Sequence, residues 1–380
     1  MSETSDWYRA LGVSAHKPYL QPFHTATYFA KPLPDLAGSE TYRFFLHADG
    51  VGTKGILSYL WWKESQDPLV WAHLAQDALV MNTDDLACAG VVEGFVFSTT
   101  IQRNPFHIPD EVVQAIIEGV YAFVAQLNQW GVRAEVAGGE TADMPDVVRT
   151  IALEAVAAAR VRLDQLIPIR RPDRRVYIVG LASFGQASYE TSYNSGIGCN
   201  GLTAARHLLL KAEYAKQYPE TVAPELPTPY QGDLRLSDTL EGHAVGALLT
   251  APTRTYLPIL RDIYRECRSA IYAVIHCTGG GQRKALKYLP YTLIAKTNFF
   301  PLPPIFAALQ GRRPIEALFE VFNMGHRLEL YVLPEAVASV QAIAQGYNVE
   351  SRLIGEAYPI ETPSRLIGEF AGRRWEWASP

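Results

Sequence analysis

An apolar run that ends in a glycine-rich, charged hexapeptide is the feature that most restricts the fold of this chain. Residues 42–48 are rich in aromatic and apolar side chains, which predicts a β-strand. Residues 49–54 read Asp-Gly-Val-Gly-Thr-Lys, and the two glycines permit a tight turn and close approach of a ligand to the backbone. Asp49 offers a hard oxygen ligand for Mg²⁺ and Lys54 a positive charge for phosphate. The spacing is not that of a P-loop, and an ordinary turn remains the alternative.

A second acidic pattern lies in a helix predicted from Asp67 to about Ala89. Asp77 and Asp84 are seven residues apart, so they differ by about 20° around a helix, whereas Asp85 is roughly 80° from Asp77. The other positions of this helix are mostly apolar or small. Two interpretations stay open: a solvated acidic face, or carboxylates that line a buried metal site.

Two later segments repeat the order of strand, glycine turn and polar residues. A short strand predicted at residues 132–136 runs into residues 138–145, Gly-Gly-Glu-Thr-Ala-Asp-Met-Pro. This segment suits either a metal–phosphate site or a tight polar turn. A strand predicted at residues 272–276 meets residues 277–281, Cys-Thr-Gly-Gly-Gly, and then a helix. Such a turn presents N–H groups to an anion, although a tight connection alone also needs glycine.

The order of strands and helices predicts an α/β (α+β) fold in two domains, which suits a length of 380 residues. Further strands are predicted at residues 93–100 and 147–161, with a helix at residues 109–130 between them. Residues 7–40 contain several prolines and are predicted to form an irregular arm. A break rich in proline and charge at residues 168–175 separates the halves. The predicted units are an N-terminal domain at 1–165, a C-terminal domain at 172–360 and a tail at 361–380.

Composition and charge exclude several classes of protein. The chain is 48% hydrophobic and 19% charged, which is typical of a soluble globular protein. A formal net charge of -5, without a basic stretch, argues against a nucleic-acid partner. No apolar run approaches the ~18–20 residues that cross a bilayer, and the first six residues lack the apolar core of a signal peptide. Four scattered cysteines do not suggest a zinc site or a disulfide framework. We therefore expect a cytoplasmic protein without a membrane partner.

Eight motifs occur in an order that resembles the phosphoribosylformylglycinamidine cyclo-ligase (aminoimidazole ribonucleotide synthetase) family. They lie at residues 49–54, 76–86, 138–145, 180–183, 200–201, 252–254, 278–281 and 322–325. The resemblance implies a two-domain synthetase-like fold whose N-terminal sheet forms a barrel with that of a partner subunit, and so a homodimer. It also implies ATP-dependent closure of formylglycinamidine ribonucleotide, the small-molecule substrate, to aminoimidazole ribonucleotide, ADP and phosphate in purine biosynthesis.

The resemblance further implies roles for individual residues. The catalytic set is Asp49, Lys54 and Asp85, and the ligands for Mg²⁺ are Asp49, Asp77, Asp85 and Glu140. ATP or a substrate phosphate would contact a wider set of glycine, hydroxyl and amide residues: Gly50, Gly52, Thr53, Gly138, Gly139, Thr141, Asn200, Thr278, Gly279 and Gly280.

One departure from the family pattern affects the site. Residues 198–201 read Gly-Cys-Asn-Gly where relatives carry His-Ser-Asn-Gly, after an insertion at residues 186–197. Because Gly198 has no side chain to replace the histidine, we expect the inserted loop to close over the substrate phosphate as a lid. A plain surface insertion is the alternative.

Two other functions stay open. One is a phosphotransferase like thiamine-phosphate kinase, from the same superfamily, and the other is a non-catalytic nucleotide-binding regulator. A regulator would not need its metal carboxylates, and Asp49, Asp85 and Glu140 are all present.

Overall fold

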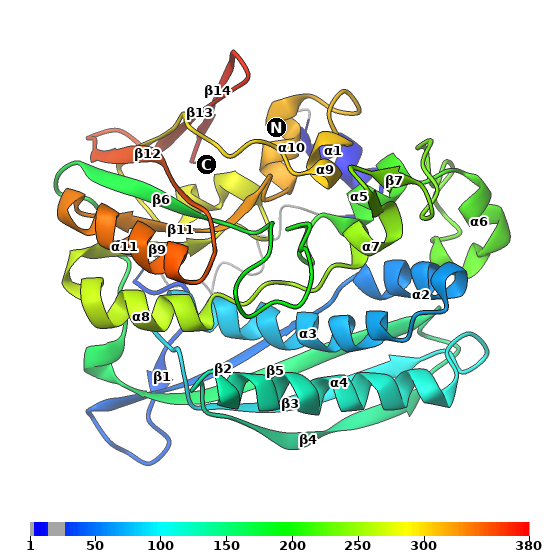
Figure 1. Ribbon diagram of the computed structural model, residues 1–380. Coiled ribbons are helices and arrows are strands. Elements are labelled where there is room, and N and C mark those ends of the chain that lie inside the picture. The colour runs from blue at the N-terminus through cyan, green and yellow to red at the C-terminus, as the bar shows by residue number, and fades with distance from the viewer. Residues whose placement is uncertain (1–3, 14–26, 380) are drawn as a thin grey trace.

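The computed structural model of this protein describes residues 4–13 and 27–379. Two β-sheets lie apart, with helices α3 (Leu69–Cys88) and α8 (Leu257–Cys267) running between them (Figure 1). One sheet is built from the N-terminal half and the other from the C-terminal half, as the order of predicted elements indicated. The connection between the halves contains the break at residues 168–175.

The N-terminal sheet has five strands, in which β3 and β4 pair in parallel and the other neighbours pair antiparallel. Its strands, in spatial order, are β1 (Leu33–Pro34), β2 (Tyr42–Gly50), β5 (Ile151–Arg162), β3 (Phe95–Arg103) and β4 (Ala134–Asp143). Burial alternates along β5, where Leu153 and Ala155 are buried and Glu154 is exposed. This alternation is typical of a sheet that packs on a core through one face only.

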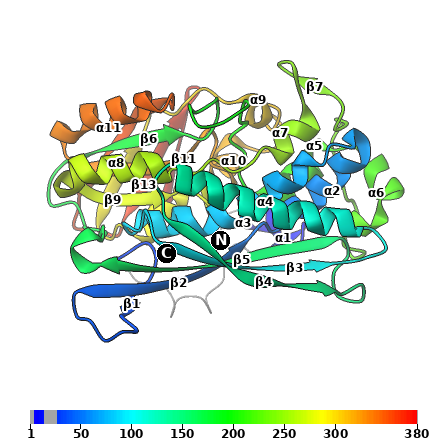
Figure 2. The same cartoon turned by 60° about the horizontal axis from the view of Figure 1, so that its bottom comes forward.

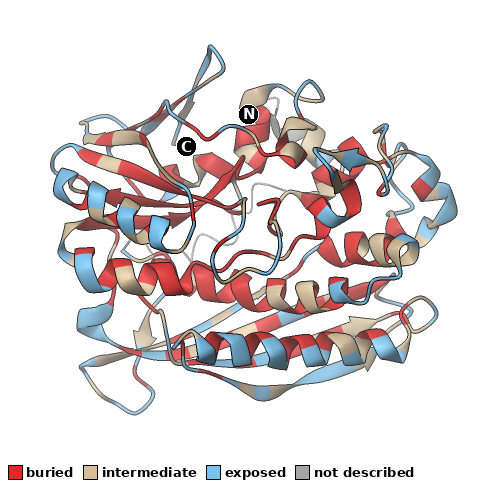
Figure 3. Cartoon of the chain, in the orientation of Figure 1, coloured by how far each residue is buried: buried red, intermediate tan, exposed pale blue. Residues whose placement is uncertain are grey.

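Helices α3 and α4 (Asp110–Gln129) cover one face of this sheet, and no described helix covers the other (Figure 2). Helix α2 (Lys54–Ser65) precedes α3 along the chain. Helix α3 is buried on nearly all sides because it also contacts β9 and α8 of the C-terminal half (Figure 3). Asp77 and Asp84 are therefore fully buried, so the solvated acidic face considered for this helix is wrong.

The C-terminal sheet has seven strands, antiparallel except for β10 and β13. In spatial order they are β14 (Arg373–Ala378), β13 (Arg365–Phe370), β10 (Thr292–Lys296), β12 (Ser351–Pro359), β6 (Val176–Ala182), β11 (His326–Val332) and β9 (Ile271–His276). Strands β13 and β14 lie within the segment set apart as a tail at 361–380. Because β13 pairs with β10 and β14 pairs with β13, this segment is the edge of the sheet rather than a separate extension.

The remaining described elements are short. The helices are α1 (Thr4–Arg9), α5 (Leu202–Leu209), α6 (Glu213–Gln217), α7 (Val245–Thr250), α9 (Pro304–Ala307), α10 (Ile315–Val321) and α11 (Pro334–Gly346). Strands β7 (Thr239–Leu240) and β8 (His243–Ala244) form a small hairpin, and a 3-10 helix spans Gly281–Lys287. None of the helices in the described ranges has both the length and the apolar character that crossing a membrane requires.

Two details of the predicted elements differ in the structure. Residues 138–143 do not form a turn, because β4 continues through them and stays paired with β3 to Asp143. The pairing shifts by one residue after Val136, and Gly138 has a φ of 129° that favours glycine at this β-bulge. Of the irregular arm predicted at residues 7–40, residues 14–26 lie outside the described part of the chain.

Candidate functional site

The candidate site centres on two carboxylates, Asp49 near the end of β2 and Asp85 in α3. Burial raises the pKa of Asp49, and the negative charge of Asp85 raises it further. The two groups therefore lie close enough to repel each other, as carboxylates that share a divalent cation do. The structure brings together the two residues that the sequence predicted both as catalytic groups and as metal ligands.

Two histidines hold the carboxylate of Asp85 from opposite halves of the chain. His276, the last residue of β9, has its Nδ1 2.5 Å from Asp85 Oδ1, and His47 of β2 has its Nε2 3.5 Å from Asp85 Oδ2. Burial would raise the pKa of Asp85, but the charge of Lys284 and the bonds from His276 and His47 hold it well below its usual value. Asp85 is thus an anion at neutral pH.

His47 carries a positive charge beside this anion. Its Nδ1 lies 3.0 Å from Asn82 Oδ1, and the Asn82 amide nitrogen donates to three backbone oxygens, so the imidazole donates to Asn82. Burial lowers the pKa of His47, but the hydrogen bond to Asp85 and the Asp85 charge outweigh burial and raise it to about 9. No sequence motif indicates His47, although it shares a strand face with Asp49 two residues later.

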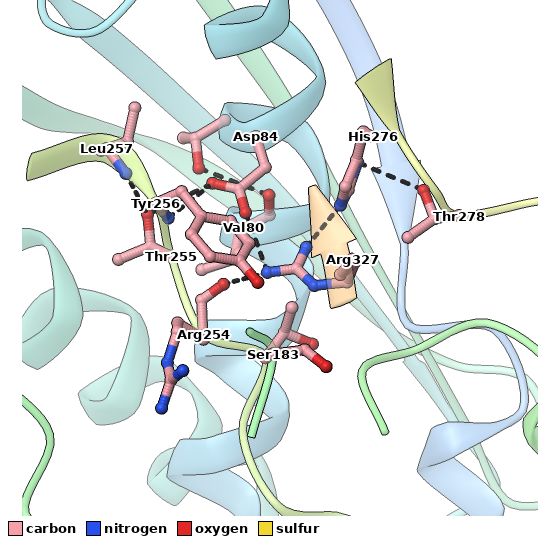
Figure 4. A network of polar contacts seen from close by, with 12 residues as sticks. Val80, Asp84, Ser183, Arg254, Thr255, Tyr256, Leu257, His276, Thr278 and Arg327 are labelled. Carbon is pink, nitrogen blue, oxygen red and sulfur yellow. Dashed lines mark hydrogen bonds and ion pairs between the residues drawn. The ribbon is translucent and has the colours of Figure 1, made fainter. Parts of the chain in front are cut away.

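His276, in contrast, is neutral because it is buried and because an arginine lies against it (Figure 4). Arg327 of β11 donates from Nη1 to His276 Nε2 at 2.5 Å. Burial lowers the pKa of His276 to about 4, and the Arg327 charge adds to this effect. Since Nε2 accepts from Arg327, Nδ1 carries the proton and donates to Asp85. The hydroxyl of Thr278 lies 3.2 Å from the same Nδ1.

Arg327 is itself fixed in a buried network that joins α3 to the C-terminal half. Its Nη2 donates to Asp84 Oδ2 at 3.0 Å and also to the backbone oxygen of Arg254 (Figure 4). The Arg327 side chain also lies beside Gly198, the position where the resemblance implies a histidine in relatives. A Cβ at Gly198 would lie 3.4 Å from Arg327 Cδ, and Gly198 has a φ of 68°. The positive φ favours glycine at this position, and a side chain there would be in van der Waals contact with Arg327.

Lys54 and Asp77 form a separate, fully buried ion pair. Lys54 Nζ lies 2.8 Å from Asp77 Oδ1 and 2.6 Å from the backbone oxygen of Ala251. The same Asp77 oxygen accepts from the backbone N–H and the hydroxyl of Thr253 at 2.7 and 2.5 Å. Both side chains are therefore engaged with each other and with the C-terminal half. The expectation that Lys54 holds phosphate and Asp77 holds metal stays a prediction that this geometry does not favour.

Glu140 does not join Asp49 and Asp85. Strand pairing places Glu140 in one cross-strand row with Thr100, Glu154 and Gly50. Asp49 precedes Gly50 and so points to the opposite face, toward the helices. Glu140 is exposed on the uncovered face. At Gly50, a Cβ would meet the carboxylate of Glu154 at 1.9 Å, so a larger residue here would displace the end of that side chain.

The other residues predicted to bind a ligand fall into three groups. Gly138, Gly139 and Thr141 belong to the edge strand β4, with Thr141 exposed. Gly52 has a φ of 53° in the turn before α2, and Thr53 Oγ1 lies 2.8 Å from Thr203 Oγ1.

The third group meets at the glycine turn after β9. A Cβ at Gly279 would lie 3.8 Å from Asn200 Oδ1, so Asn200 lies beside this turn. Gly279 and Gly280 have φ values of 62° and 122°, which few other residues adopt. Thr278 contacts His276, which contacts Asp85, so the structure connects this turn to the carboxylate pair.

The inserted loop at residues 186–197 is packed rather than open. Glu190 accepts from Arg254 at 2.9 and 2.6 Å, and Asn194 and Ser195 are buried with hydrogen bonds to the backbone of Pro252 and Leu248. These bonds fasten the loop to the segment before α8. The expectation of a mobile lid is not supported, because opening would break several buried polar contacts.

One further group of residues has the composition of a metal site. Cys277, His326 and Glu329 are buried and offer ligand atoms within 4.8 Å of one another. Lys296 Nζ, however, lies 2.7 Å from Glu329 Oε2, where its ammonium group takes the place of a cation. The carboxylate pair Asp49 and Asp85 is therefore the better candidate for a divalent ion.

Comparison with known proteins agrees with the motifs. The family model for the N-terminal domain of AIR synthase related proteins matches residues 35–161. The phosphoribosylformylglycinamidine cyclo-ligase of Methanocaldococcus jannaschii is 29% identical over 83% of this chain and 78% of its own length. The corresponding proteins of Methanococcus vannielii and Saccharolobus solfataricus are 27% and 28% identical, over 87% and 82% of this chain and 81% and 78% of their own lengths.

Solved structures support the same fold. Phosphoribosylformylglycinamidine synthase II of Thermotoga maritima superposes on the whole chain with a TM-score of 0.56 and 11% identity, and this chain spans about half (51%) of it. The HypE–HypF complex gives a TM-score of 0.50 at 11% identity over 89% of this chain and 90% of the matched chain. The protein thus has a mixed α/β fold of the AIR synthase type, and, as its motifs predicted, it resembles phosphoribosylformylglycinamidine cyclo-ligases over more than four fifths of its length.

Proposed function

We propose that this protein is an ATP-dependent cyclo-ligase that converts formylglycinamidine ribonucleotide to aminoimidazole ribonucleotide, ADP and phosphate in purine biosynthesis. The observation that carries the proposal is its similarity to proteins named for this reaction over 83% of the chain. The site agrees with it, because a carboxylate pair, a glycine turn and a buried polar network meet between the two halves.

The reaction explains which residue types the site needs. The oxygen of a formyl amide is a poor leaving group, and phosphorylation by ATP turns it into a good one. The neighbouring nitrogen then attacks the same carbon, the ring closes and phosphate departs. Such a reaction depends chiefly on positioning and on neutralising the phosphoryl charge.

Asp49 and Asp85 fit a magnesium ion, since they are hard oxygen ligands whose mutual repulsion is visible in the raised pKa of Asp49. Asp77 does not fit, because Lys54 already neutralises it, and Glu140 lies on the other face of the sheet. When bound, Mg²⁺ would neutralise charge on phosphate oxygens. ATP binding is also consistent with a structure of Thermotoga maritima PurL complexed with ATP, a protein that shares this fold at 12% identity.

The chain's own groups then have distinct tasks. His276 donates its Nδ1 proton to Asp85 and so holds the carboxylate in one orientation. His47, as an imidazolium, offsets part of the negative charge of Asp85 and Asp49. The backbone N–H groups of the turn at Gly279 and Gly280 and the amide of Asn200, which lies beside this turn, would contact phosphate oxygens.

We also propose a cytoplasmic homodimer in which the uncovered face of the N-terminal sheet packs on the same face of a second chain. Leu46, Ala158 and Val96 form a cross-strand apolar row on that face. Leu46 and Val96 are 59% and 44% exposed, so a partner sheet would remove both from water.

One assay tests the proposed reaction. The purified protein is incubated with Mg-ATP and formylglycinamidine ribonucleotide, and aminoimidazole ribonucleotide and ADP are measured together. Equal amounts of both products are expected. Thiamine phosphate serves as the control substrate, and its phosphorylation in place of ring closure would overturn the proposal.

A further inference from the structure

The site lacks the phosphate-binding lysine that the sequence led us to expect. Lys54 is fully buried, and its ammonium group already donates to Asp77 and to the backbone of Ala251. To reach a phosphate, Lys54 would have to leave a buried carboxylate without a partner, which is unfavourable. A different cation must then face the anionic ligand.

Lys284 has the properties that Lys54 lacks. It lies in the 3-10 helix Gly281–Lys287, directly after the glycine turn, and is partly exposed. Its ammonium group lies 4.6 Å from the centre of the Phe29 ring. Within residues 4–13 and 27–379, Lys284 has neither a hydrogen bond nor an ion pair, so its charge is available to a ligand.

Lys284 follows directly on the glycine turn, which Thr278 and His276 connect to Asp85. Apart from burial, which opposes the shift, its charge is the largest influence on the lowered pKa of Asp85. The same charge also acts on Asp49, where it opposes the increase caused by burial and by Asp85. These influences agree with its place beside the glycine turn, where a Cβ on Gly280 would lie 4.0 Å from Lys284 Cβ.

We propose that Lys284 binds a phosphate group in this site, in the role that the sequence assigned to Lys54. A phosphate there would contact the Lys284 ammonium group and the N–H groups of Gly279 and Gly280, and its remaining oxygens would face the side of Asp49 and Asp85. The phosphate belongs either to the nucleotide or to the ribose 5-phosphate of the substrate. The inference rests on the proposed function only in naming these two molecules as the sources of the phosphate.

Calorimetric titration separates the two sources of phosphate. ADP with Mg²⁺ is one probe and ribose 5-phosphate is the other. Lys284→Met should weaken binding of one probe at least tenfold, about 1.4 kcal/mol, and the affected probe identifies the phosphate. Lys284→Arg, which keeps the charge, should restore most of the affinity.

The matched control is Lys287→Met, which removes an exposed lysine from the same 3-10 helix. It should change neither affinity by more than about twofold if the tenfold loss reflects a direct contact. Melting temperatures of all variants show whether they remain folded.

Unchanged binding in Lys284→Met, equal losses in Lys287→Met, or no binding of either probe by the wild-type protein would each overturn the proposal. If Lys284→Met loses binding but the wild-type protein forms no aminoimidazole ribonucleotide, Lys284 remains a phosphate-binding residue and the proposed reaction is wrong.

Discussion

Arg327 donates from Nη1 to His276 Nε2 at 2.5 Å, and this hydrogen bond determines that the nitrogen of His276 facing Asp85, Nδ1, carries the proton. Because a neutral imidazole carries one proton, an accepting Nε2 requires that Nδ1 is the donor. The neighbouring ion pair of Arg327 with Asp84 anchors the guanidinium group. The two adjacent aspartates of α3 thus have different roles, because Asp84 binds the arginine and Asp85 faces the site.

We predict that Arg327→Lys lowers kcat at least tenfold with a smaller effect on the melting temperature. A lysine can still neutralise Asp84 but lacks the second donor arm that reaches His276. Nitrogen NMR spectra of ¹⁵N-histidine-labelled protein should show His276 changing from a pure Nδ1–H tautomer to a mixture. An unchanged tautomer together with unchanged kcat would reduce Arg327 to a structural residue.

Asp49→Asn should abolish turnover without lowering stability. The reason is that Asp49 and Asp85 repel each other, so loss of one charge should not weaken the protein without metal. Thermal melts with and without Mg-ATP provide the measurement, because a bound ligand raises the melting temperature of the wild type. A variant that loses activity only because it unfolds would contradict the assignment of Asp49 to the site.

The sequence predicted Asp49 and Asp85 as site residues because their local patterns, a strand exit and an acidic helix, match motifs of the family that the chain resembles. It could not separate Asp77 from them. Thr253, which donates to Asp77, and Ala251, which accepts from its partner Lys54, come from the other half of the chain, and only the packing of α3 between the halves brings them near.

The position of Glu140 depends on one residue of strand register. Counting alternate residues from Ala134 puts Glu140 on the helix-facing side, with Asp49. The bulge between Val136 and Gly138 inserts one residue and moves Glu140 to the uncovered face. A single sequence does not reveal whether a glycine pair forms a turn or a bulge, so local motifs could not place this carboxylate.

Lys54→Met should destabilise the protein by about 3–5 kcal/mol, because Asp77 would remain buried without its partner. The double variant Lys54→Met with Asp77→Leu should recover much of this loss, since two apolar side chains need no counter-charge. Urea unfolding followed by tryptophan fluorescence measures both. If Lys54→Met is as stable as the wild type but no longer binds ADP, Lys54 is a ligand residue after all.

The buried pair of Lys296 and Glu329 predicts a pH-dependent contribution to stability. Burial raises the pKa of Glu329, but the Lys296 charge, together with His326, outweighs burial and holds it at about 2, below the ordinary value of 4.5. A lowered folded-state pKa stabilises the protein above the ordinary value, and this stabilisation is lost as pH falls toward 2. The melting temperature of Glu329→Gln should therefore lie below that of the wild type at pH 7. The difference should shrink below about pH 4.5. A constant difference from pH 7 to pH 3 would contradict this assignment.

The uncovered face of the N-terminal sheet predicts how the protein assembles. Leu46, Ala158 and Val96 form an apolar row there, and their exposure is explained if a second copy of the sheet packs on it. Light scattering should give twice the 42.1 kDa mass of one chain at micromolar concentration.

Val96→Glu should reduce this mass to one chain, because two glutamates would be buried in the interface without partners. Tyr121→Glu, on the exposed side of α4, is the matched control and should remain a dimer. A wild-type mass of one chain would show that this face is open to solvent and that the site is complete within a single subunit.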